Sequence, residues 1–224
     1  MKSIEEARRL PLGYHWDRLD MEETYNYRFG GIGWPGKDQG FGVVIGVLEK
    51  RRRSGPPWRE FHVLDECESR NPKKLLCKCL DLHWRYAPTG WVTNHVDAAG
   101  DAFSEELHQD NAAAYDFHHS PARFANQHPG ANPYSYLVNG VIEELVGGSE
   151  KRLYLKNDKA AEQLHALRKD EIPLLLPGTY PAVEAVGFAL VEARDDYNSI
   201  PRSWDDDDYD DDFGNEDMDG FAWG

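Results

Sequence analysis

Two acidic residues stand at positions where a carboxylate can hold a metal ion. Asp97 ends the apolar segment WVTNHVD and is followed by two alanines and Gly100, which leave the carboxylate open to a ligand. Glu184 lies in the apolar segment YPAVEAVGFAL, where an acid is costly without a partner. Two acids placed in this way could share one Mg²⁺ or Mn²⁺, because hard cations prefer oxygen ligands. The commoner roles stay open, namely an N-cap for Asp97 and solvent exposure for Glu184.

A second group of residues suits the phosphate backbone of a nucleic acid. Arg51, Arg52 and Arg53 follow one another in a turn between two apolar segments, and Trp58 and Arg59 come soon after. Positive charge beside an aromatic ring is typical of nucleic-acid contacts. An ordinary solvated turn is the alternative. The chain has no G-x-x-x-x-G-K-[ST] motif, so we expect no phosphate loop for ATP hydrolysis.

The three cysteines, Cys67, Cys77 and Cys79, lie in one short stretch and cannot all pair with one another. This spacing is untypical of a secreted disulfide framework and favours a reducing, cytoplasmic compartment. Cys77, Cys79 and His83 form a C-x-C-x3-H pattern on a predicted helix, without a second ligand pair nearby. We therefore expect buried thiols rather than a zinc site.

The net charge of -15 is unevenly distributed over the 224 residues. Residues 198–224 carry ten acidic side chains against Arg202 alone, a net charge of -9, which leaves -6 for the rest of the chain. We expect this acidic tail to be disordered, because its aspartates repel one another. It is either a docking peptide for a basic partner or a solubilising tail. No apolar stretch approaches the ~20 residues of a membrane helix, so we expect no membrane partner.

The elements that position these residues follow from the spacing of apolar side chains. Residues 1–24 are polar and mixed, and we interpret them as an N-terminal arm or linker. Apolar runs separated by turn residues predict three antiparallel strands, at 25–34, 41–50 and 59–66. Asp65 and Glu66 then fall at the end of a strand, where we expect a turn; contacts that support the metal ligands are the alternative.

Helices and strands alternate after residue 70. Asn71 and Pro72 are typical of a helix start and predict a helix over 71–87. The further predicted elements are a strand at 91–97, a helix at 101–111, a strand at 112–119, a helix around 136–145, a strand at 152–156, a helix at 158–171 and a closing helix at 180–197. This order predicts an α/β domain over residues 25–197, with a mixed sheet flanked by helices.

The same segments resemble a known family. Between Tyr25 and Tyr197 the chain reads, in order, GIGWPGKDQGFGVVIG, FHVLDE, VTNHVDAAG, SYLVNGVIEELVGG with RLYL, and YPAVEAVGFAL. These motifs resemble the C-terminal nuclease domain of phage large terminase subunits, which has a ribonuclease H-like fold. The resemblance implies a metal-dependent endonuclease, a hydrolase that cuts double-stranded DNA during viral genome packaging in the infected host cell. It also implies the portal or procapsid and a separate packaging ATPase as partners.

The resemblance further implies roles for single residues. Gly33 stands where the family has its first metal-binding aspartate, and Asp38, which matches a nearby second acid, would have to replace it. Asp97, Glu184 and Asp38 are then the implied catalytic metal ligands, and Arg123 is the nearest candidate for the family's basic residue. On this view Gly33→Asp should raise metal affinity. The missing acid leaves open a catalytically inactive ribonuclease H-like module that binds DNA or the packaging machinery.

Overall fold

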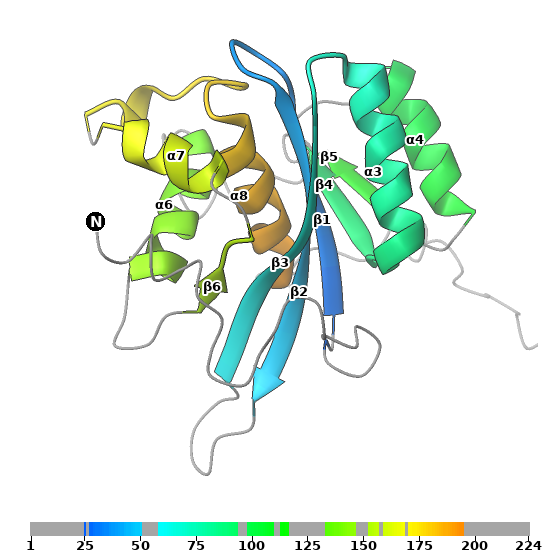
Figure 1. Ribbon diagram of the computed structural model, residues 1–224, viewed down its shortest axis with the longest axis horizontal. Helices are drawn as coiled ribbons and strands as arrows, with labels where there is room; N and C mark the ends of the chain where they lie inside the picture. Colours follow the sequence, from blue (N-terminus) through cyan, green and yellow to red (C-terminus); the bar gives the residue numbers. More distant parts are fainter. Residues whose placement is uncertain are drawn as a thin grey trace, which may run out of the picture.

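The computed structural model describes residues 25, 27–50, 58–93, 98–109, 113–116, 133–146, 152–156, 159–168 and 170–194. The predicted N-terminal arm and acidic tail lie outside these ranges. The described part is an α/β fold in which one mixed sheet carries helices on both faces (Figure 1), as the sequence predicted. No helix within these ranges is long and apolar enough to cross a membrane.

The described strands form one six-stranded sheet in the order β5-β4-β1-β2-β3-β6. The strands are β1 (Tyr27–Gly33), β2 (Gly40–Lys50), β3 (Trp58–Ser69), β4 (Gly90–Thr93), β5 (Ala113–Asp116) and β6 (Leu153–Tyr154). β1, β2 and β3 are joined by antiparallel pairs, whereas β4 lies parallel to β1, β5 parallel to β4 and β6 parallel to β3. The chain therefore builds an antiparallel centre and adds parallel strands on either side of it.

Helices cover the two faces of this sheet in separate groups. One face carries α3 (Pro72–Tyr86) and α4 (Ala98–His108), and the other carries α6 (Pro133–Val146), α7 (Lys159–Ala166) and α8 (Pro181–Ala193), as Figure 1 shows. A 3-10 turn, η2 (Ile172–Leu174), lies between α7 and α8. The sheet is thus enclosed on both sides, which its apolar side chains require.

The helix α3 begins and ends where its sequence directs. The side chain of Asn71 accepts a hydrogen bond from the backbone N–H of Lys74, and Pro72 occupies the first turn. At the other end Ala87 adopts a left-handed conformation with φ of 44°, and its N–H donates to the carbonyl of His83. The predicted start at Asn71 and Pro72 is confirmed.

Several element boundaries differ from the prediction: α4 begins at Ala98 and not at residue 101, and α6 begins at Pro133 and not near residue 136. β3 runs on to Ser69 because β2 continues to pair with it as far as Gly40, so Asp65 and Glu66 lie inside a strand and not at a turn. The helix predicted over 158–171 ends at Ala166, since a turn closed by the N–H of Glu171 on the carbonyl of Arg168 follows it.

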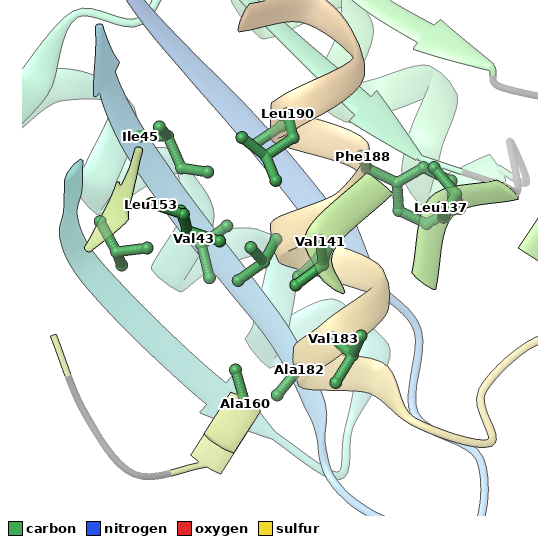
Figure 2. Packing of buried hydrophobic residues seen from close by; sticks show 14 of the residues in the cluster. Val43, Ile45, Leu137, Val141, Leu153, Ala160, Ala182, Val183, Phe188 and Leu190 are labelled. Atoms are coloured by element: carbon green, nitrogen blue, oxygen red, sulfur yellow. The ribbon is translucent and has the colours of Figure 1, made fainter. Parts of the chain in front are cut away.

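Each face of the sheet has its own hydrophobic core. The α8 face packs the residues drawn in Figure 2, which come from β2, β6 and the helices α6, α7 and α8: Val43, Ile45, Leu137, Val141, Leu153, Ala160, Ala182, Val183, Phe188 and Leu190. The α3 face packs a second cluster that contains Ile32, Trp91, Leu75, Cys79 and Phe103. Apart from Val191, every residue of α8 is buried, so this helix is the central element of its layer.

Candidate functional site

Three elements meet at one end of the sheet, where the sequence predicted a metal site. Ile32, next to the last residue of β1, pairs with Thr93 at the end of β4. The indole N–H of Trp34 donates to the hydroxyl of Thr93 at 2.6 Å, which joins the chain after β1 to the end of β4. The first turn of α8 packs on the same end, with Pro181 against Gly33.

The carboxylate of Glu184 folds back onto the backbone that leads into α8. Its Oε2 accepts the N–H of Gly178 at 3.0 Å, and its Oε1 accepts the N–H of Tyr180 at 3.2 Å. Glu184 is only 2% exposed, so the alternative of solvent exposure is wrong. Burial raises the pKa of Glu184 to about 7, although the hydrogen bonds from Gly178, Tyr180 and Thr179 oppose this rise. The side chain therefore fixes the entry to α8.

Gly178 makes this arrangement possible through its backbone conformation. Its φ of 72° lies in the left-handed region, which glycine adopts without a steric penalty. The turn at Gly178 directs its N–H toward the carboxylate of Glu184. A residue with a side chain would strain the loop that holds this acid.

The backbone of α8 fills the space above Gly33. A Cβ atom at Gly33 would overlap the backbone carbonyl of Pro181, and one at Gly31 would overlap the carbonyl of Ala185. Both obstacles are backbone atoms of a buried helix, so neither can move aside cheaply. An aspartate at position 33 does not fit this packing. An aspartate at position 33 could act as a metal ligand only if the first turn of α8 shifted, and the expectation for Gly33→Asp stays a prediction.

Asp38 lies exposed in the turn between β1 and β2. Gly36 of the same turn packs closely against Gly178, so this turn touches the loop that binds the carboxylate of Glu184. The oxygens of Glu184 are nevertheless engaged by backbone N–H groups. Within the described ranges no three His, Cys, Asp or Glu side chains gather around a possible metal position. Asp97, the third acid of the predicted Mg²⁺ or Mn²⁺ site, lies outside the described residues, so that site stays a prediction.

The remaining predicted site residues lie outside the described part of the chain. They are Asp97, which was predicted to share the metal, the basic turn of Arg51, Arg52 and Arg53, and Arg123. The structure describes only their neighbours, such as Thr93 and Ala98 on either side of the segment that holds Asp97.

A polar cluster that the sequence did not predict surrounds Asp65 in β3. Its Oδ2 accepts hydrogen bonds from Arg85 at 2.9 Å and from the hydroxyl of Tyr86 at 2.8 Å, and its Oδ1 accepts one from Lys156 at 3.2 Å. Burial tends to raise the pKa of Asp65, but the bonds from Tyr86, the Glu66 N–H and Lys156 together lower it. No local pattern signals this cluster, because Lys156 lies 91 residues further along the chain.

A cavity of about 740 Å³ opens beside this cluster, between β3, α3 and α7. Its lining is strongly charged and includes Glu66, Glu68, Lys78, Asp81 and Lys159. Glu184, at the entry to α8, is not among the residues that line this cavity.

The C-x-C-x3-H pattern does not form a zinc site among the described residues. Cys79 is buried, as expected, but Cys77 is exposed, so the expectation of a buried thiol is wrong for Cys77. The Nδ1 atom of His83 accepts a hydrogen bond from the indole of Trp91 at 3.4 Å. The two cysteines of the pattern thus lie on different sides of α3.

Comparisons with known proteins add no relative to these observations. No family model matches the chain, and no curated protein matches it.

Proposed function

We propose that this chain is a ribonuclease H-like module, similar to the nuclease domain of phage large terminase subunits, that binds double-stranded DNA during genome packaging without cutting it. One observation carries the proposal. The backbone of α8 occupies the space at Gly33 where the family has its first metal-binding aspartate.

The order of elements supports the ribonuclease H-like part of the proposal. Three antiparallel strands are followed by a helix, by a strand parallel to β1 and later by a helix that carries a buried acid. This is the order on which the resemblance to the terminase nuclease rests. The meeting of β1, β4 and α8 at one end of the sheet agrees with it.

The contacts of Glu184 and Gly33 favour binding over cleavage. Hydrolysis by two metal ions needs carboxylates that bridge the ions and remain free to do so. Here Glu184 is held by two backbone N–H groups, and position 33 has neither a carboxylate nor room for one. A domain that keeps the sheet and its helices but has no free carboxylate at positions 33 and 184 is suited to binding DNA and not to cutting it.

A metal-dependent endonuclease is the second candidate, and one observation favours it. Glu184 and the end of β4 that precedes Asp97 lie at the same end of β1. In that case Asp97, Glu184 and Asp38 would hold Mg²⁺ or Mn²⁺ after a rearrangement of the loop at Gly178.

The proposed partners follow from the resemblance and the charge distribution. Double-stranded DNA is the ligand of the domain, and Arg51, Arg52, Arg53 and Arg123 are its proposed contacts with phosphate. The acidic tail at 198–224, with its net charge of -9, suits a basic surface on the portal or procapsid. A separate packaging ATPase would supply the motor, in the cytoplasm of the infected host cell.

A combined binding and cleavage assay on the full-length chain tests the proposal. We expect a short linear duplex to be retarded in a gel at low salt, and supercoiled plasmid to stay intact with Mg²⁺ or Mn²⁺. Plasmid cleavage that needs metal and disappears in Asp97→Asn and in Glu184→Gln would refute the non-cutting module and support the nuclease. Circular dichroism would confirm that both variants fold.

A charge variant distinguishes DNA binding from a purely protein partner. Replacing Arg51, Arg52 and Arg53 together by alanine should weaken duplex binding and reduce its salt dependence. Each lost phosphate contact lowers the slope of log K against log salt by about 0.9, so three contacts lower it by about 2 to 3. If the duplex is not retarded even at low salt, DNA is not the ligand, and the packaging machinery becomes the target.

A further inference from the structure

Cys67 and Cys79 bring their sulfur atoms together between the sheet and α3. Cys67 lies in β3 and Cys79 in α3, and their Sγ atoms are 3.8 Å apart. Both sulfurs lie over Gly42 of β2, where a Cβ atom would overlap each of them. The missing side chain at Gly42 therefore provides the space that the pair occupies. The two sulfurs are in non-bonded contact in the folded chain, and they must approach by about 1.7 Å to reach the S–S distance of ~2.05 Å of a disulfide.

The two thiols differ in their access to solvent. Cys67 is partly exposed and lines the 740 Å³ cavity beside Asp65. Cys79 is completely buried behind it. A reagent that enters the cavity therefore meets Cys67 first and reaches Cys79 only through the sulfur of Cys67.

The electrostatic environment agrees with this order. The hydrogen bond with Cys79 lowers the pKa of Cys67, and the Gly42 amide and the charge of Lys78 act in the same direction, against burial and the charge of Asp65, which raise it. Burial raises the pKa of Cys79 well above its ordinary value. The thiolate, which is the reactive form, thus develops at the accessible member of the pair.

We propose that Cys67 and Cys79 are a redox-active pair that takes small-molecule disulfides through the cavity. The Cys67 thiolate attacks one sulfur of the disulfide RSSR, which forms a mixed disulfide and releases one RS⁻. The sulfur of Cys79 then attacks the sulfur of Cys67 and releases the second RS⁻. The two protein thiols are oxidised to one disulfide, RSSR is reduced to two RSH, and the protons of the two cysteines end on the released thiols.

This pair is independent of the proposed function in DNA packaging. Its product joins β3 to α3, two elements that already pack on each other, so the oxidised chain keeps the same fold. The cavity next to Asp65 gains a covalent crosslink in its wall. The reaction thus adds a modification site that responds to the thiol and disulfide state of its surroundings.

Oxidised glutathione is the probe, and peptide mapping of the native full-length chain is the readout. Trypsin cuts after Arg59, Arg70, Lys74, Lys78 and Arg85, which places each cysteine in a peptide of its own. After quenching with an alkylating reagent, we expect the Cys67 peptide EFHVLDECESR to be linked to the Cys79 peptide CLDLHWR. The Cys77 peptide LLCK should not be part of this link. Glutathione on Cys67 should appear before the crosslink.

Matched variants separate the two steps. Cys79→Ala should hold Cys67 as the glutathione mixed disulfide, and Cys77→Ser should leave the crosslink unchanged. The proposal is overturned if Cys67 in the native wild-type chain reacts no faster than Cys77 and no link to Cys79 forms. It is equally overturned if the link forms only after unfolding in urea. Both of these results come from the wild-type chain, so they do not depend on the folding of a variant.

Discussion

Replacing Gly33 tests the packing on which the proposed function depends. In Gly33→Ala the new Cβ meets the backbone carbonyl of Pro181, and the first turn of α8 has to shift. Overpacking of this kind costs about 1–3 kcal/mol. Gly33→Asp adds a buried carboxylate beside the carbonyl, so we expect its loss of stability to exceed that of Gly33→Ala by about 1–3 kcal/mol. A whole domain has about 5–15 kcal/mol of stability, so the combined loss of about 2–6 kcal/mol should remove a large part of it in the aspartate variant.

Urea unfolding followed by tryptophan fluorescence measures both variants. Gly140→Ala in α6 is the matched control, because the new Cβ would meet only the flexible end of Arg194, at 3.0 Å. In a helix interior this change should be neutral or stabilise the chain by up to about 1 kcal/mol. If Gly33→Asp unfolds at the wild-type urea concentration, the close packing of α8 on β1 is refuted. If it also gains metal-dependent cleavage, the nuclease is the better assignment.

Two further predictions concern acidic side chains, the buried Glu192 and the half-buried Asp65. Burial raises the pKa of Glu192 from 4.5 to about 7. Between these two pH values Glu192 is protonated in the folded chain and ionised in the unfolded chain. The free energy of unfolding should therefore fall as the pH rises from about 4.5 to 7. At about 1.36 kcal/mol per pH unit, the loss of stability from Glu192 reaches about 3 kcal/mol. Glu192→Gln should remove most of this loss, so at pH 8 the variant should unfold at a higher urea concentration than the wild-type chain. If the urea midpoint changes between pH 5 and pH 8 by the same amount in Glu192→Gln as in the wild-type chain, Glu192 is not the cause of the pH dependence. Asp65→Asn should lose about 1 kcal/mol at pH 7, measured by urea unfolding, whereas Asp170→Asn, which affects only an exposed pair with Arg168, should lose less. Equal losses would show that the cluster around Asp65 adds no stability.

Local chemistry accounts for the parts of the fold that the sequence predicted. Asn71 accepts a backbone N–H of the first turn, and Pro72 occupies the first helical position. Both contacts lie within four residues, so the start of α3 could be predicted without any tertiary contact. The first three strands follow from apolar runs separated by turn residues, and α8 follows from a run of apolar and small residues in which Glu184 and Glu192 are the charged members. These signals lie within single elements, which is why they can be read from one chain.

The candidate site was predicted only in part. The sequence singled out Glu184 because an acid among apolar residues is unusual, and this residue is indeed buried. The sequence did not reveal that backbone N–H groups of Gly178 and Tyr180 take up its carboxylate. It marked Gly33 as a missing acid, but not as a position where the backbone of α8 leaves no room for one.

Tertiary packing alone decided the features that join distant segments. Asp65 meets Lys156 across 91 positions, and Cys67 meets Cys79 because α3 packs back onto the strand that precedes it. Residue types fix which side chains can ionise, bind or react, and local spacing fixes the helices and strands. The approach of α8 to β1 and of α3 to β3 depends on the summed burial of many apolar side chains, which no single motif encodes. The sequence therefore determined the elements and their candidate residues, and the packing of the elements determined which of those residues are free to act.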